Sequence, residues 1–341
     1  MLGKKILHLI QRFLSAIKKF PSNVNEFGIY TSMWIAWDGL FPPGKSKRYI
    51  RAIYRYTEHF LSSLLDFYKQ IEPNSASKKH KKLGEIPVWV CWLQGEEKMP
   101  EVVKICYESI KKNVPEGKKV YLVTVNNFSE YINVPEIVLD KYRRGIISSA
   151  HFSDVLRFVL MSEYGGMWVD ATIYISRMIP PEYFDSEFYS MKMDPDQCEK
   201  EACEGKWTGF LFSGTAGNTL FEFVRDSLVL WWEKHDTVVD YVLFDYIIMV
   251  AYRNLPEVKR LIDAVPVNNS EVWQLIGNLE KEYDIIRFKE VIEKNNFHKL
   301  AHQRNWKSTV ENGNLSFYGF LCKQYYGEFN EDKSFHYHTD L

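Results

Sequence analysis

The chain has 341 residues, of which 46% are hydrophobic and 16% aromatic, which excludes fibrous, disordered and low-complexity proteins. Its 43 basic and 44 acidic residues give a net charge of −1, which excludes a dedicated nucleic-acid binder with a broad cationic face. The five cysteines are odd in number and form no C-x-x-C pair, so they indicate neither a disulfide framework nor a zinc ribbon.

The first twenty residues carry a charge of their own. They hold five basic side chains and no acidic one, and their apolar residues recur at three- and four-residue spacing, which predicts a basic amphipathic helix. No apolar run there reaches the roughly 18 residues that a membrane span needs, so we expect neither a transmembrane helix nor a signal peptide. Two uses stay open: the helix lies on an anionic membrane surface, or it packs on the rest of the protein.

A polar, highly charged stretch at 73–82 has the composition of a linker. We therefore divide the chain into a helical, basic segment at 1–82 and a larger domain at 83–341. Within the first part, apolar periodicity predicts one long helix over 46–70.

Strands and helices alternate in the second part. Apolar runs predict strands at 86–93, 118–125 and 167–176, and periodicity predicts helices between them at 100–113 and 152–164. This order predicts an α/β fold of Rossmann type, with ligands at the carboxyl ends of the strands. Later strands are expected near 187–193 and 208–213, helices at 219–235 and 238–253, and irregular structure in the last forty residues.

The candidate chemistry lies between His151 and Thr172. Ser153 is a candidate helix cap, and Asp154 and Arg157 are three residues apart, on one face of the helix that follows. Asp170 falls in an otherwise apolar strand, where a carboxylate is costly unless a cation or several donors meet it. Singly, these residues also fit a surface ion pair and a strand end; as one ordered pattern they predict a binding site.

The pattern Ser153-Asp154-x-x-Arg157 … Gly165-Gly166-x-Trp168-x-Asp170 resembles the donor-site signature of glycosyltransferases with the GT-A fold. The closer resemblance is to the capsular polysaccharide synthesis glycosyltransferases, which are related to glycosyltransferase family 32. The apolar run at 86–95 resembles their first strand, and Asp240-Tyr-Val-Leu-Phe-Asp245 resembles their D-Y-x-x-x-D helix.

The resemblance implies a role for each matching residue. Trp92 and Trp168 would lie against the uracil and ribose of a UDP-sugar, and Asp154 and Arg157 would hold the donor sugar. Asp170 matches the first aspartate of the D-x-D element. Lys299 lies in a late segment that would meet the diphosphate, and Asp245 is either a carboxylate at the reaction centre or a structural helix residue.

Thr172 stands where D-x-D has its second aspartate. A divalent cation, Mn²⁺ or Mg²⁺, is expected to bind more weakly through Asp170, the diphosphate and water. His336 and His338 are candidate metal or phosphate ligands, although a solvated tail explains them better.

The sequence thus predicts a hexosyltransferase that uses a UDP-sugar, retains the anomeric configuration and builds a capsular or surface glycan in bacteria. Its acceptor would be a lipid-linked oligosaccharide, and it would be cytoplasmic, at the inner face of the plasma membrane. Two alternatives remain: a catalytically silent peripheral scaffold, which Thr172 favours, and a sugar nucleotidyltransferase. Against the second, the loop after the first strand is acidic at Glu96 and Glu97 rather than rich in glycine and lysine.

Overall fold

The computed structural model describes residues 2–40, 45–70, 83–194, 198 and 201–327. The chain forms two compact units. The first unit comprises Met1–Lys82, Ser129–Gly165 and Ser186–Asn268, and the second comprises Leu83–Phe128, Gly166–Asp185 and Asn269–Leu341. The division into domains at 1–82 and 83–341 stays a prediction.

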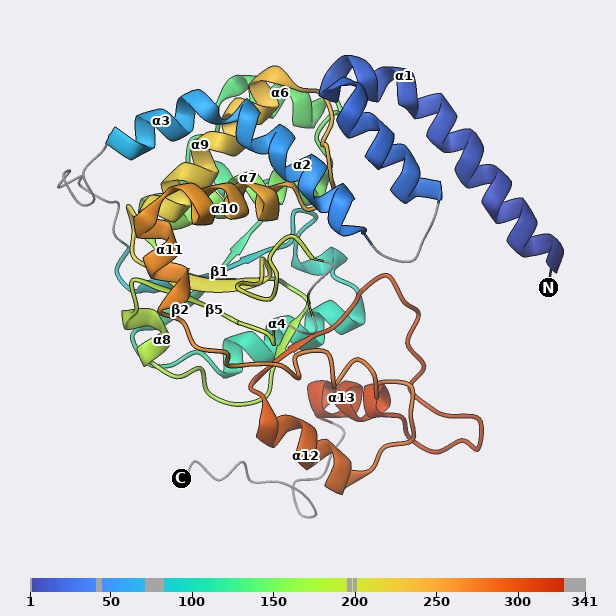
Figure 1. Ribbon diagram of the computed structural model, residues 1–341. Helices are drawn as coiled ribbons and strands as arrows, with labels where there is room; N and C mark the ends of the chain where they lie inside the picture. The colour runs from blue at the N-terminus through green and yellow to red at the C-terminus, as the bar shows by residue number, and fades with distance from the viewer. Residues whose placement is uncertain (1, 41–44, 71–82, 195–197, 199–200, 328–341) are drawn as a thin grey trace. The chain divides into compact units, whose positions relative to one another are not determined.

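The first unit begins with helix α1 (Leu2–Leu40), which bends at Gly28 (Figure 1). Gly28 has φ 74° and ψ 162°, a conformation that glycine adopts without the steric cost of a Cβ. The bend divides α1 into a first segment at 2–27 and a second segment at 29–40. The predicted amphipathic helix over the first twenty residues is therefore part of a longer helical stretch.

Two helices occupy the region that the sequence predicts as one. Helix α2 (Lys47–Phe60) begins at the cap residue Ser46, whose hydroxyl accepts a hydrogen bond from the Tyr49 backbone N–H, and α3 (Ser62–Gln70) follows. They are separated at Leu61, whose side chain is fully buried. The apolar pattern continues across Leu61, so periodicity alone could not reveal the break.

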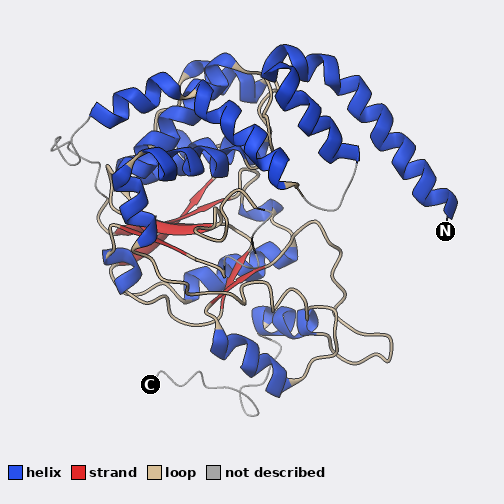
Figure 2. Ribbon diagram, viewed as in Figure 1, coloured by secondary structure: helices blue, strands red, loops and turns tan. Residues whose placement is uncertain are grey.

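Helix packing forms the core of the first unit (Figure 2). Helix α7 (Ser149–Tyr164) packs on α9 (Thr219–Lys234), and α10 (Leu243–Asn254) packs on α2 and α9. The strands β5 (Phe188–Ser190) and β6 (Leu211–Gly214) pair antiparallel. The remaining helices with residues in this unit are α5 (Phe128–Tyr131), α6 (Glu136–Arg143) and α11 (Pro256–Asp263).

Three parallel strands organise the second unit. The central strand β1 (Ile86–Cys91) pairs with β2 (Lys118–Val123) on one side and β3 (Gly166–Val169) on the other. Trp89 is the partner of Tyr121 in one register and of Trp168 in the other. A 3₁₀ turn (Glu96–Lys98) and helix α4 (Glu101–Lys112) follow β1, as the alternating pattern predicts.

The predicted strand at 167–176 is wrong in one respect, because the structure has two strands there. After β3 the chain turns at Asp170, whose carbonyl accepts from the Ile173 N–H, and β4 (Ile173–Ile175) then pairs antiparallel with β7 (Phe297–Lys299). Apolar residues on both sides of Asp170 concealed this turn, because they read as one continuous strand. It leaves Asp170 directly after a strand end.

The last forty residues are not wholly irregular. Helix α13 (Phe317–Tyr326) is capped by the Ser316 hydroxyl, which accepts from the Gly319 N–H, and buries Phe317 and Phe320. Helices α8 (Glu182–Asp185) and α12 (Ile285–Lys294) complete the second unit. The sequence does not predict α12 and α13, because their aliphatic residues are mixed with many aromatic and polar ones.

Gly166 allows two strands to approach closely. It has φ 89°, and a Cβ at this position would lie 2.2 Å from the Pro87 carbonyl oxygen of β1. Any other residue would push β3 away from β1. The double glycine at 165–166 therefore ends α7 and also sets the spacing of the strand that leads to Asp170.

The aromatic excess is explained mainly by the core. The largest fully buried side chains include Trp89 and Trp168 in the second unit and Trp231 and Trp232 in the first. Burial of each large apolar side chain contributes roughly 1.5–3 kcal/mol. The fold is α/β with both parallel and antiparallel strands, as predicted in outline. Among the helices of the described residues, none is both long and apolar enough to cross a bilayer.

Candidate functional site

Two predicted site residues stand at the carboxyl ends of neighbouring parallel strands in the second unit. Trp92 directly follows β1, and Asp170 directly follows β3. Because β1 and β3 are parallel and in register at Trp89 and Trp168, both chain segments leave the sheet at the same edge. This edge is where α/β proteins bind their ligands.

The Asp170 carboxylate is held by two side chains. Lys299 Nζ lies 2.7 Å from Oδ2, and the Trp168 indole Nε1 donates a 2.9 Å hydrogen bond to Oδ1. The Lys299 and Asp170 side chains are 16% and 25% exposed, so the pair lies where a ligand can still reach it. A cation and an N–H donor thus meet the charge that the apolar strand alone would leave uncompensated.

Strand β7 positions Lys299. Lys299 is the register partner of Ile173 in β4, and its backbone N–H donates to the Val272 carbonyl at 3.0 Å. The next residue, Leu300, donates its N–H to the Thr172 carbonyl at 2.9 Å. Thr172 is buried, and its carbonyl bonds to the residue that follows Lys299. The residue at the third position of the D-x-D-like element therefore helps to hold the segment that carries Lys299.

Trp168 contacts Asp170 through its N–H, while its ring is buried. Its side chain is only 1% exposed, so the ring packs in the core of the second unit. Because the ring is buried, it is not exposed for stacking on a ligand, and its N–H bonds to Asp170.

Trp92 lies near the same cluster. Its ring meets the exposed His302 ring edge to face, with centroids 5.3 Å apart. Burial lowers the pKa of His302, and the positive charge of Lys299 lowers it further. The Trp92 Nε1 is buried and has no hydrogen-bond partner among the described residues. A buried N–H normally has a hydrogen-bond partner, so the Trp92 N–H can donate to a hydrogen-bond acceptor on a bound ligand.

Asp154 and Arg157 form a buried pair in α7 of the first unit. Helix α7 begins earlier than predicted, because Ser148 and not Ser153 caps it by accepting from the His151 N–H. Both residues therefore lie beyond the first turn, where they are 9% and 6% exposed, with Nη1 and Oδ1 3.3 Å apart. The Arg157 guanidinium also lies 5.1 Å from the centre of the Phe244 ring. A solvated surface pair is thus the wrong interpretation.

Asp245 lies in the first turn of α10 in the first unit. Its Oδ1 accepts a 2.7 Å hydrogen bond from the Trp207 indole Nε1. Burial raises the pKa of the Asp245 carboxyl to about 7, against the Trp207 hydrogen bond and the charge of Arg157, which both lower it. Asp245 therefore changes charge near neutral pH.

Trp207 and the partners of Asp240 are not predicted from the sequence. Trp207 is far from Asp245 in sequence, and no spacing rule links them. Asp240 precedes α10, accepts from the Tyr49 hydroxyl at 2.6 Å and pairs with Lys45 Nζ at 2.7 Å. These bonds attach α2 to the start of the D-Y-x-x-x-D segment and give Asp240 a structural explanation.

The model of the capsular polysaccharide synthesis protein family matches residues 45–321, which include both groups of site residues. This chain belongs to that family. Among solved structures, it is similar to the PaToxG glycosyltransferase, with 11% identity, a TM-score of 0.37, and coverage of 72% of this chain and 95% of the other. It is also similar to the apo structure of the bifunctional glycosyltransferase WbbM, with 12% identity, a TM-score of 0.39, and coverage of 93% and 70%. None of the curated proteins compared with the chain matches it.

The described residues of this family member do not fit a divalent cation site. Both oxygens of Asp170 already accept from Lys299 and Trp168, and the ammonium lies where a cation would bind. The described part of the chain also holds no group of three or more histidine, cysteine, aspartate or glutamate side chains arranged to bind a metal. His336 and His338 lie outside the described residues, and their role stays a prediction.

The loop after β1 is unlike a phosphate-binding loop. Gly95 has φ 92°, and the Glu97 carboxylate lies so close that a Cβ on Gly95 would be 2.5 Å from its Oε1. An acidic side chain folded over the loop repels phosphate. This arrangement weakens the nucleotidyltransferase alternative.

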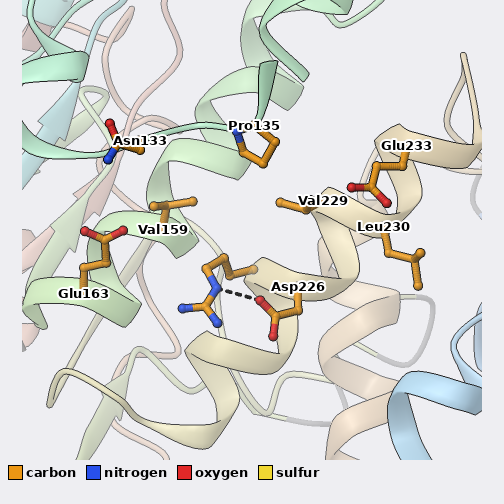
Figure 3. A pocket seen from close by; sticks show the side chains of 9 residues that line it. Asn133, Pro135, Val159, Glu163, Asp226, Val229, Leu230 and Glu233 are labelled. Atoms are coloured by element: carbon orange, nitrogen blue, oxygen red, sulfur yellow. Dashed lines mark hydrogen bonds and ion pairs between the residues drawn. The ribbon is translucent and has the colours of Figure 1, made fainter. Parts of the chain in front are cut away.

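An open hollow of about 450 Å³ lies in the first unit, beside α7 and α9 (Figure 3). Its lining includes Glu163, Asp226 and Glu233 and a single cation, Arg225, whose Nε donates to Asp226 at 2.7 Å. None of the predicted site residues lines it. Its negative charge is unsuited to a diphosphate, so we assign it no role in donor binding.

Proposed function

We propose that this capsular polysaccharide synthesis protein is a glycosyltransferase of GT-A type that transfers a hexose from a UDP-sugar to a glycan acceptor. The observation that carries the proposal is the cluster of Trp168, Asp170 and Lys299 at the carboxyl end of β3. Family membership supports a role in capsular or surface glycan synthesis.

The cluster suits the chemistry of sugar transfer. Cleavage of a sugar–diphosphate bond builds positive charge at the anomeric carbon and negative charge on the departing UDP. The Lys299 ammonium can donate hydrogen bonds to the diphosphate oxygens, and Asp170 can accept them from sugar or ribose hydroxyls. Since the two groups neutralise each other before the donor binds, neither is left as an isolated buried charge.

Trp92 and Trp168 take different parts in this proposal. The buried Trp92 N–H, which lacks a partner among the described residues, would donate to the bound nucleotide, beside the stacking role that the family pattern implies. Trp168 would act as a positioning residue, because its buried ring leaves its N–H to orient Asp170.

The first-unit residues enter the proposal through the sequence pattern. Asp154 and Arg157 would hold the hydroxyls of the donor sugar, and Asp245 would serve the reaction or the acceptor. The family resemblance favours retention of the anomeric configuration, with the leaving phosphate helping to deprotonate the acceptor hydroxyl.

Hydrolysis of UDP-hexoses by the full chain is the direct test. Incubation with a panel of UDP-hexoses, followed by chromatography of UDP and nuclear magnetic resonance of the released sugar, measures turnover and anomeric configuration. We expect one or a few donors to be turned over, and Asp170→Ala to lose at least about 100-fold in rate. Asp66→Ala, which removes an exposed carboxylate in α3, is the matched control. Absence of turnover with every donor, in both the native chain and Asp170→Ala, would support the silent scaffold instead.

A further inference from the structure

The exposed apolar side chains of the protein are concentrated on α1. Seven of the seventeen large apolar side chains exposed among the described residues belong to this one helix. Scattered apolar residues are normal on a protein surface, but a concentration on one element marks an interaction surface.

The second segment of α1, at 29–40, presents these side chains as a row. Ile29, Tyr30, Met33 and Trp37 are each more than half exposed, and their spacing places them within about 100° of one another around the helix. Thr31 and Ser32, which point the other way, are buried against the first unit. The segment is therefore fixed by one face and offers an apolar, partly aromatic face to solvent.

Helix α2 adds a row of positive charge beside this face. Arg48, Arg51 and Arg55 are exposed at spacings of three and four residues, while Tyr49, Ala52 and Ile53 on the opposite side are buried. The Arg48 guanidinium lies 5.8 Å from the centre of the Trp34 ring of α1, so the basic row adjoins the apolar row. The α1–α2 surface consists of Ile29, Tyr30, Met33, Trp37, Arg48, Arg51 and Arg55.

The carboxylates of these helices do not cancel that charge. Glu26 of α1 is 2.8 Å from His235 Nδ1, and Glu58 of α2 accepts from the Asn254 amide at 2.8 Å. Both are directed into the first unit. The third carboxylate, Asp38 of α1, lies close enough to the buried Tyr49 and Tyr246 that its charge raises the pKa of both hydroxyls. The first segment of α1 continues the same character, with Phe13, Leu14 and Ile17 half or more exposed beside exposed Lys18 and Lys19.

We infer that the α1–α2 surface and the first segment of α1 bind the surface of an anionic lipid bilayer. Tryptophan and tyrosine favour the boundary between lipid headgroups and acyl chains, and arginine and lysine are attracted to anionic headgroups. A helix that lies in this boundary needs an apolar face and flanking cations, which is what both segments of α1 provide.

Charge argues against a second copy of the chain as the occupant. Self-association through this surface would bring the same basic side chains of two copies together, including the segment 1–20, which has five basic residues and no acidic one. Like charges at close range oppose such an interface. An anionic bilayer instead complements them. This inference does not depend on the proposed transfer reaction, although a lipid-linked acceptor would be met at the same surface.

Vesicle co-sedimentation of the full chain tests the inference without any activity assay. We expect binding to vesicles of phosphatidylcholine mixed with phosphatidylglycerol, little binding to phosphatidylcholine alone, and weakening by salt. The triple variant Ile29→Ser, Met33→Ser and Trp37→Ser should lose at least about tenfold in apparent affinity. Arg51→Glu with Arg55→Glu should lose a similar factor.

Matched controls separate this surface from general stickiness and charge. Met178→Ser, Val267→Ser and Ile286→Ser remove equally exposed apolar side chains elsewhere, and Arg287→Glu with Lys294→Glu makes the same change of net charge on α12. Both controls should bind vesicles like the native chain. Circular dichroism and size-exclusion chromatography with light scattering check folding and oligomeric state. Equal binding by the native chain and the α1 triple variant would overturn the inference. So would a native dimer that the triple variant dissociates, if neither protein bound vesicles.

Discussion

Two carboxylates of this protein each accept a hydrogen bond from a tryptophan indole, yet their surroundings differ. Asp170 in the second unit receives the Trp168 N–H at 2.9 Å and the Lys299 ammonium at 2.7 Å. Asp245 in the first unit receives the Trp207 N–H at 2.7 Å, and burial raises its pKa to about 7. The indole N–H and the charge of Arg157 therefore do not offset the effect of burial on the pKa of Asp245, whereas an ammonium in contact with Asp170 supplies the opposite charge directly.

This difference separates two kinds of function. A paired carboxylate such as Asp170 is suited to bind and orient a ligand, since a cation and an N–H donor hold it in place. A carboxyl that titrates near neutrality, such as Asp245, is suited to exchange protons or to make stability depend on pH.

The largest effect should come from loss of the Lys299 charge. Lys299→Ala leaves the Asp170 carboxylate without its cation, and we expect UDP-hexose hydrolysis to fall by about 100-fold or more. Lys299→Arg keeps the charge and should retain much of the activity. Titration calorimetry with UDP, in the absence of a sugar, measures whether binding falls in parallel. Equal UDP affinity and equal hydrolysis in Lys299→Ala and the native chain would reject a donor-site role.

The next effect concerns the stability that Asp245 sets. Its pKa is raised from the ordinary value of 3.8 to about 7, so the folded state binds this proton more tightly than the unfolded state does. Its contribution to stability is therefore present at acid pH and is lost as pH rises towards 7. We expect Asp245→Asn to gain roughly 1–3 kcal/mol over the native chain between about pH 4 and about pH 8.

Urea unfolding at several pH values measures this change in stability. The pH–rate profile of the same variant then tests whether Asp245 also takes part in the reaction. If it does, the limb of the pH–rate profile near 7 disappears in Asp245→Asn. If its role is structural, the profile keeps its shape while stability changes. A constant stability difference between variant and native chain at all pH values would show that Asp245 does not titrate as proposed.

A smaller effect follows from exchange of either indole for a phenyl ring. Trp207→Phe removes the hydrogen bond that lowers the pKa of Asp245, so the pH midpoint of its stability change should move upward. Trp168→Phe removes a donor from Asp170, whose charge Lys299 still meets, so UDP affinity should fall only about two- to fivefold. The two variants are matched controls for each other. A shift of the midpoint in Trp168→Phe alone would contradict the comparison.

Removal of divalent cations by a chelator should have the smallest effect on UDP binding. Because Lys299 lies on the Asp170 oxygen, we expect UDP binding by the native chain to be unchanged when EDTA replaces Mn²⁺. In Lys299→Ala the carboxylate is exposed to other cations, and Mn²⁺ should partly restore UDP binding. Strict dependence of the native chain on Mn²⁺ in calorimetry would contradict this prediction.

Local sequence was sufficient to predict the strands and helices whose apolar residues follow a regular pattern. Five predicted elements correspond to observed ones within a few residues. They are the strands at 86–93 and 118–125 and the helices at 100–113, 152–164 and 219–235. Apolar runs and helical periodicity report which face of an element is buried, and they do so without knowledge of the partner. The same rules failed at Leu61 and Asp170, where apolar residues lie on both sides of a break between two elements.

Residue types and spacing by themselves determined the α/β class, the basic character of the first helix and the candidate side chains of the site. Only tertiary structure decided what those side chains contact. Lys299 reaches Asp170 because β7 pairs with β4, and Trp207 reaches Asp245 although no sequence spacing links them. The reason is physical: the charge state of a carboxyl depends on burial and on the atoms within a few ångströms, and both are set by segments distant in sequence.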